Sequence, residues 1–152
     1  MAAGTWDFFV RCKEKLGLAE FDFSARALRI SLHSIGASVN LSAASDMTAL
    51  SEIGSELAAT RGYVANGETI SGGLWTVSAT DAVYKGVTGV FWSANAGNLG
   101  SGTIKYAVLH ASLAAGSRFP LAWVTLSTTP FLVADASRLT INNGGGDFFK
   151  IQ

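Results

Sequence analysis

Residues 102–127 read GTIKYAVLHASLAAGSRFPLAWVTLS, which is two apolar runs separated by a short polar stretch. Side chains of a β-strand alternate between its two faces. Ile104 and Tyr106 therefore share one face of the first run, and Trp123 and Thr125 share one face of the second. Apolar side chains dominate both faces of both runs. This pattern predicts two strands in the middle of a β-sheet that is covered on both sides.

Another strand is predicted by the strict alternation in residues 26–33, RALRISLH. A half-buried strand turns its apolar side chains toward the core and its polar side chains toward solvent. We expect three side chains to point inward and three to point outward: Leu28, Ile30 and Leu32 inward, and Arg29, Ser31 and His33 outward.

Further short apolar runs lie between clusters of Gly, Asn and Ser, which is typical of a β-sandwich or barrel. Asn66-Gly67 is a strong turn signal within this pattern. A strand followed by a turn near Asp81 is expected in 74–84, and further strands are expected at 87–93, at 131–133, at 138–141 and at Phe148, Phe149 and Ile151. Loops are expected at 34–47 and 94–102, and a turn at 142–146. A helical turn or two, interrupted at Gly54, is expected in 48–61. About eight or nine strands predict a mainly β fold, a single antiparallel β-sandwich or jelly-roll-like domain with a short N-terminal helix.

That helix is predicted over residues 5–17, TWDFFVRCKEKLG, and it is expected to end at Gly17. Thr5 or Asp7 is the expected capping residue. The i, i+3, i+4 spacing gives the helix an apolar stripe: Trp6, Phe9, Val10 and Leu16. A helix this short must dock by its aromatic face, either on its own sheet or on a neighbouring subunit.

We divide the chain into an N-terminal helix or arm, residues 1–20, and a β-sandwich domain, residues 21–152. Terminal segments and long loops are free to reach a neighbour. The candidate partner-binding residues are therefore Trp6, Phe8 and Phe9, and loops 34–47 and 94–101 are further candidate contacts.

Only 14% of the 152 residues are charged, and the formal net charge is zero. Such a surface suits a protein packed against other subunits, and it argues against a nucleic-acid partner, whose phosphates require clustered positive charge. The single cysteine, Cys12, is expected to be a small buried apolar residue. No apolar run is long enough to cross a membrane and no signal-peptide pattern opens the sequence, so we expect cytosolic synthesis and no membrane partner.

No pattern in the sequence predicts a catalytic, metal-binding or cofactor-binding site. His33 and His110 lack Cys, His or acidic neighbours at metal-ligand spacing, and no G-x-S-x-G motif indicates an activated serine. The Gly-rich stretch 144–147 lacks the Lys of a phosphate-binding loop. Three tryptophans fall inside expected strands, which favours core positions: Trp75, Trp92 and Trp123. We predict that the protein is not an enzyme and has no cofactor.

The order of these features resembles a group of small virion proteins of tailed bacteriophages and prophages. Four short pieces carry the resemblance best: Glu52-Ile53, Gly62-Tyr63, Tyr106-Ala107-Val108 and Pro120-Leu121. Longer stretches extend it over nearly the whole chain: ALRISLH, LSEIGSELAATRGYVANGETI, GVFWSA, IKYAVLHASL, PLAWVTLS and FLVADASRLTIN. The loops between these stretches match poorly.

The resemblance implies a non-enzymatic virion component, namely a capsid decoration or cement protein bound outside the head shell. Its implied partners are the major capsid protein and further copies of itself, as a homotrimer. Its implied location is the capsid surface of the virion, and the host cytoplasm during assembly. Two other functions stay open: a tail, neck or fibre-associated virion protein, and a carbohydrate-binding β-sandwich, which would require an exposed Trp75, Trp92 or Trp123.

Overall fold

The computed structural model describes residues 6–20, 22, 26–37, 41, 47–78, 81–85, 89–113, 116–141 and 147–151. In these residues the fold is mainly β, with antiparallel sheets and one short N-terminal α-helix, as the sequence predicts. The strands are β1 (Asp7–Phe8), β2 (Leu28–Ser34), β3 (Glu68–Thr69), β4 (Leu74–Ser78), β5 (Asp81–Lys85), β6 (Val90–Ser93), β7 (Leu99–Ser112), β8 (Arg118–Thr125), β9 (Phe131–Val133), β10 (Arg138–Ile141) and β11 (Asp147–Ile151). The helices are α1 (Val10–Gly17) and the 3-10 helices η2 (Ile35–Ala37) and η3 (Leu50–Glu52).

The main sheet has the strand order β1-β8-β7-β2-β3. Its centre is the predicted pair, in which Ala107 lies opposite Val124 and Leu109 lies opposite Ala122. Strand β9 extends the same edge of β7 beyond β8, where Ile104 lies opposite Phe131. The prediction of a central strand pair is confirmed, because β7 and β8 are buried along most of their length.

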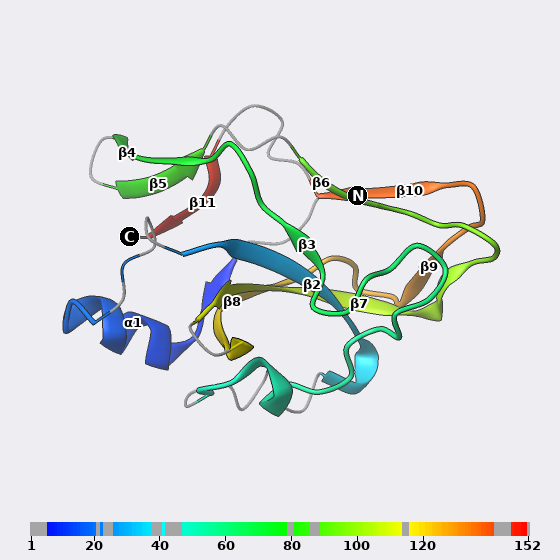
Figure 1. The fold of residues 1–152 in the computed structure, drawn as a ribbon, viewed down its shortest axis with the longest axis horizontal. Coiled ribbons are helices and arrows are strands. Elements are labelled where there is room, and N and C mark those ends of the chain that lie inside the picture. The colour runs from blue at the N-terminus through cyan, green and yellow to red at the C-terminus, as the bar shows by residue number, and fades with distance from the viewer. Residues whose placement is uncertain are drawn as a thin grey trace.

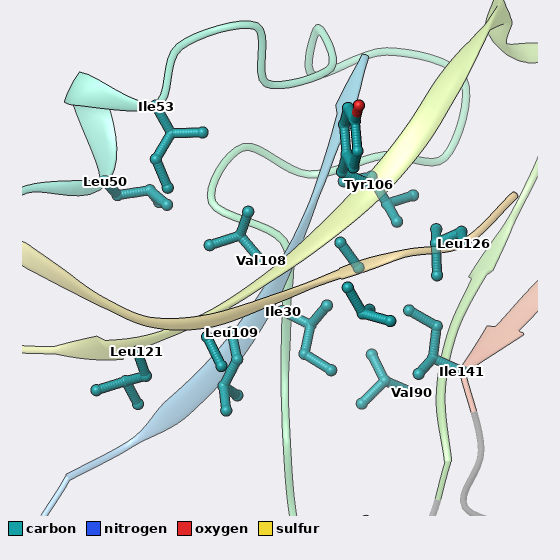
Figure 2. Close-up of a cluster of buried hydrophobic side chains, with 14 of the residues drawn as sticks. Ile30, Leu50, Ile53, Val90, Tyr106, Val108, Leu109, Leu121, Leu126 and Ile141 are labelled. Atoms are coloured by element: carbon teal, nitrogen blue, oxygen red, sulfur yellow. The ribbon is translucent and has the colours of Figure 1, made fainter. Parts of the chain in front are cut away.

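Two smaller sheets, β6-β10 and β4-β5-β11, lie on the same side of the main sheet (Figure 1). Figure 2 shows Val90 of β6 and Ile141 of β10 in the same cluster as Ile30 and Leu109 of the main sheet. Trp92 of β6 is also buried in this core, as the sequence predicts. Trp75 and Trp123 are half-buried and pack against it.

The opposite face of the main sheet is covered by residues 47–67, which we call the strap. In Figure 2, Leu50 and Ile53 of the strap lie on the side of the sheet toward which Val108 points. Ile53 and Val108 are fully buried. The strap contains the predicted helical turn, η3, and its interruption at Gly54, which has a positive φ of 66°.

Because the strap covers this face, one expectation for residues 26–33 is wrong. Leu28, Ile30 and Leu32 point into the core as predicted, but Ser31 and His33 are also buried. Strand β2 is therefore covered on both sides and is not half-buried.

The N-terminal segment also differs from the prediction. Asp7 and Phe8 form β1 and pair with Trp123 and Ala122 of β8, so the helix begins at Val10 instead of residue 5. Phe9 is the N-cap residue and no side chain caps the helix. The predicted stripe is wrong at Val10, which is exposed, whereas the side chains of Phe9 and Cys12 are buried. The helix ends at Gly17 as predicted and docks on its own sheet, where the Phe9 amide donates to the Leu121 carbonyl at 3.0 Å.

The remaining predicted elements are mostly confirmed. Strands β6, β9 and β10 occupy the expected segments, and β11 is an edge strand of its small sheet. In the segment 74–84 the sequence predicts a strand followed by a turn near Asp81. Asp81 is instead the first residue of β5, which pairs with β4, and residues 79–80 lie outside the described residues. The expected loop at 94–102 ends at Leu99, where β7 begins. In the expected loop at 34–47, residues 35–37 form η2 and Leu41 is buried. The predictions for 38–40, 42–46 and 142–146 lie outside the described residues.

Candidate binding pocket

Three polar side chains are buried in the described part of the chain: Ser31, His33 and His110. All three lie on the strap side of the main sheet. The register fixes this, because Ser31 lies opposite Val108 and Arg29 lies opposite His110 on the neighbouring strand. A buried polar group needs a hydrogen-bond partner, and the strap supplies most of them.

His33 is held between β2 and the strap. Its Nδ1 lies 2.8 Å from the Gly54 carbonyl oxygen, and its Nε2 lies 2.9 Å from Ser31 Oγ. A carbonyl only accepts, so Nδ1 donates to Gly54 and Nε2 accepts the hydroxyl proton of Ser31. Burial lowers the pKa of His33, which keeps the ring neutral. The pair has the hydrogen bonding of an activated serine, but Ser31 is 0% exposed and its hydroxyl cannot reach a substrate.

His110 is held less completely. Its Nε2 lies 3.2 Å from the Asn66 carbonyl oxygen, but no described residue bonds its buried Nδ1. Burial is the main cause that lowers its pKa to about 3, and the nearby charges of Arg118 and Arg29 act in the same direction. The ring is therefore neutral at ordinary pH and carries one unpaired polar atom.

Tyr63 and Glu56 join the strap to β2. The Tyr63 hydroxyl donates to Glu56 Oε1 at 2.7 Å and accepts from the Leu32 amide at 3.0 Å. Burial and the neighbouring Glu56 carboxylate raise the pKa of Tyr63, so its hydroxyl stays protonated. The backbone N–H of Asn66 donates to the same Glu56 oxygen.

The predicted turn at Asn66-Gly67 brings the strap backbone against the sheet. The Arg29 guanidinium donates to the carbonyl oxygens of both residues, at 3.1 Å for Asn66. Gly67 has a φ of +68°, and a Cβ there would lie 1.7 Å from the Ile30 carbonyl oxygen. A residue with a side chain does not fit at position 67. The glycine lets the turn lie close against β2, and this places the Asn66 carbonyl within reach of His110.

A pocket of about 420 Å³ opens between the strap and residues 116–118. His33, Glu56 and Arg118 contribute charged or polar groups to its wall. Arg118 Nε is buried and has no partner among the described residues, and its Nη1 lies 3.4 Å from the Gly116 carbonyl oxygen. The remaining lining residues are small, apolar or hydroxyl-bearing: Ala49, Leu50, Ser51, Gly54, Ser55, Asn66, Gly116 and Ser117.

The predicted partner-binding residues lie elsewhere. Trp6 and Phe8 are half-buried and pack against the core, and Phe9 is 1% exposed. Cys12 is buried as predicted, and burial raises the pKa of its thiol to about 12. Sequence reasoning missed the pocket, although the Asn66-Gly67 turn and the break at Gly54 are visible in the sequence.

The described residues contain no group of three His, Cys, Asp or Glu side chains placed to hold a metal ion. They also contain no helix of the length and apolarity that a membrane span requires. Comparisons with protein-family models, with curated proteins and with solved structures found no match to this chain.

Proposed function

We propose that this protein is a structural component of a bacteriophage virion. In this proposal it is a capsid decoration protein that binds across adjacent subunits of the head shell. It acts by adhesion and carries out no reaction. The support is the resemblance of its sequence to small phage virion proteins, together with the structural positions of the residues that carry this resemblance.

Those residues belong to the framework that joins the strap to the main sheet. The Tyr63 hydroxyl bonds β2 and Glu56, and Ile53 is the fully buried residue of the strap on the side that faces the sheet. Gly62 has a φ of +89°, and a Cβ there would lie 1.9 Å from the Ser93 carbonyl oxygen. Pro120 lies opposite His110 in the central pair. The resemblance therefore rests on residues that build a scaffold, and this is the observation that carries the proposal.

Adhesion of such a scaffold requires exposed apolar groups that a partner can cover. Stable protein contacts bury about 1,200–2,000 Å² in total, and many weak contacts on a lattice add up. Large exposed apolar side chains occur on several elements of the described chain: Val10, Leu18, Ile35, Val64, Leu74, Phe91 and Leu132. They are spread over the surface, as a protein that touches more than one neighbour requires.

The composition of purified particles tests the proposal. Phage particles whose genome encodes this protein are purified, and the protein is quantified by mass spectrometry against the major capsid protein. A ratio on the order of one copy per capsid subunit supports a decoration protein. A handful of copies per particle supports a neck or tail location instead, and absence from the particles refutes both.

Surface variants test whether the N-terminal segment makes the contact. Deleting residues 1–9 cannot separate attachment from folding, because Phe9 is buried in the core. The double variant Val10→Asp, Leu18→Asp changes two residues that are 58% and 61% exposed, and is expected to lower attachment to particles while the unfolding midpoint stays unchanged. Val64→Asp, at 56% exposure, tests the strap in the same way, and a loss of attachment in this variant alone would place the contact on the strap. Equal attachment of the wild type and the double variant would exclude this contact.

A further inference from the structure

We propose that the pocket between the strap and residues 116–118 binds a peptide segment that carries an acidic side chain, with Arg118 pairing with its carboxylate. This site and ligand class rest on the geometry of the pocket. The expectation that the segment belongs to a capsid subunit rests on the proposed function.

The pocket wall carries one guanidinium, that of Arg118, and one carboxylate, that of Glu56. Arg29 also lies near His110 but does not line the pocket. The Glu56 carboxylate accepts from the Tyr63 hydroxyl and the Asn66 backbone amide, so the strap engages it. No described carboxylate forms an ion pair with Arg118. Arg118 is therefore the charged group of the wall with which an added carboxylate can pair.

The donors of the two arginines differ in how they are used. Arg29 donates to the carbonyl oxygens of Asn66 and Gly67, so its guanidinium is committed to the strap. Arg118 has a buried Nε with no described partner and only a long contact from Nη1 to Gly116. Because Nε is buried, a ligand in the pocket would reach Arg118 through its terminal nitrogens, since the residue as a whole is half-buried and lines the pocket. A guanidinium binds a carboxylate through charge-assisted hydrogen bonds, so Arg118 is the group that such a ligand would engage.

The size and lining of the pocket select a peptide over a free ion. A volume of about 420 Å³ is far larger than one carboxylate requires. Leu50 and Ala49 offer apolar surface to the methylene groups of an acidic side chain. Ser51 and Ser55 belong to the same lining, and residues of this type can bond a peptide backbone.

The test uses two blocked tripeptides, acetyl-Ala-Glu-Ala-amide and acetyl-Ala-Gln-Ala-amide. The full chain has two histidines, so the imidazole NMR signals of His33 and His110 report on the pocket directly. The Glu peptide is expected to shift the His33 signal saturably, with an affinity about tenfold higher than that of the Gln peptide. Arg118→Gln is expected to remove this preference, whereas Arg61→Gln, which changes an arginine bonded to Ala96, is expected to keep it.

Ser51→Trp provides a second variant, because it fills the pocket from an exposed position and leaves both histidines in place. It is expected to abolish binding of both peptides. Equal affinity for the two peptides, an unchanged preference in Arg118→Gln, or tighter binding of inorganic phosphate than of the Glu peptide would overturn the proposal. These outcomes are independent of particle composition, so failure of this proposal and failure of the proposed function are separate results.

Discussion

Acidification is expected to weaken the fold through His110. The usual pKa of 6.5 falls to about 3 in the folded protein, mainly because the ring is buried. The folded state therefore binds fewer protons than the unfolded state between these two values. The stabilisation is fully present above the unfolded pKa and is lost progressively as the pH falls toward the folded pKa. The linkage relation gives a loss of about 2 kcal/mol from this one residue between about pH 7 and about pH 5.

The structure explains why protonation is unfavourable at this site. A protonated ring would carry a donor at Nδ1, for which no described acceptor is in place. The new charge would also lie near Arg29 from β2, Arg118 from β8 and the neighbouring His33. The strap carries four titratable side chains, which are Glu52, Glu56, Arg61 and Tyr63. The Glu56 carboxylate acts in the opposite direction on His33.

Urea unfolding of the wild type and of His110→Gln at both pH values measures this effect. The glutamine amide can donate to the Asn66 carbonyl in place of Nε2 but does not titrate. Burial also lowers the pKa of His33, so both proteins are expected to lose some stability in acid. The loss in His110→Gln is expected to be smaller by about 2 kcal/mol. Identical losses in the two proteins would refute the assignment of acid sensitivity to His110.

Three further predictions concern the strap and the single thiol. Gly67→Ala is expected to cost about 3 kcal/mol or more in urea unfolding, because its Cβ would collide with the backbone of β2. Gly116→Ala, with a φ of +77° and no atom within 4 Å, is the control and is expected to cost about 1–2 kcal/mol; equal costs would contradict the collision. Tyr63→Phe is expected to cost about 1–3 kcal/mol in the same assay because a β2 amide and Glu56 both lose their bond to the hydroxyl, and an unchanged midpoint would show that these bonds contribute nothing. Cys12, whose pKa burial raises to about 12, is expected to react with a thiol reagent at least about a hundredfold more slowly in the native protein than in urea, and a fast native reaction would contradict its burial.

The central strand pair could be predicted because its sequence allows one environment only. Apolar side chains on both faces, as at Leu109 and Val108, require cover on both sides whatever the cover is. Alternation then fixes which side chains share a face, and the observed register agrees with it from Tyr106 to Leu109, before the irregularity in the pairing with β8 at His110.

The burial of His33 and Ser31 could not be predicted in the same way. Alternation separates polar from apolar faces, but it does not say whether water or protein lies against the polar face. Here the cover is a strap whose groups in contact with the polar face are largely backbone carbonyls, at Gly54 and Asn66. Every residue has a backbone carbonyl, so the residue types of the strap do not reveal that its carbonyls bond the buried side chains of β2 and β7.

The N-terminal helix was predicted too long for a related reason. The spacing of Trp6, Phe9 and Val10 satisfies a helical period, and nothing local forbids a helix there. Pairing of Asp7 and Phe8 with β8 supplies backbone hydrogen bonds from a distant strand and decides the outcome. The pocket likewise combines His33, Glu56 and Arg118, which are separated in sequence and become neighbours only through the sheet register and the strap.

The pocket and the buried histidines are linked through Arg118. A carboxylate bound to Arg118 would offset the positive charge that helps to lower the pKa of His110, and so it would raise that pKa. By linkage, protonation of His110 would in turn strengthen binding of the carboxylate. The strap is therefore expected to be weakest in mild acid when the pocket is empty, and a bound carboxylate would stabilise it there as long as the pH stays above the carboxylate's own pKa of about 4.3.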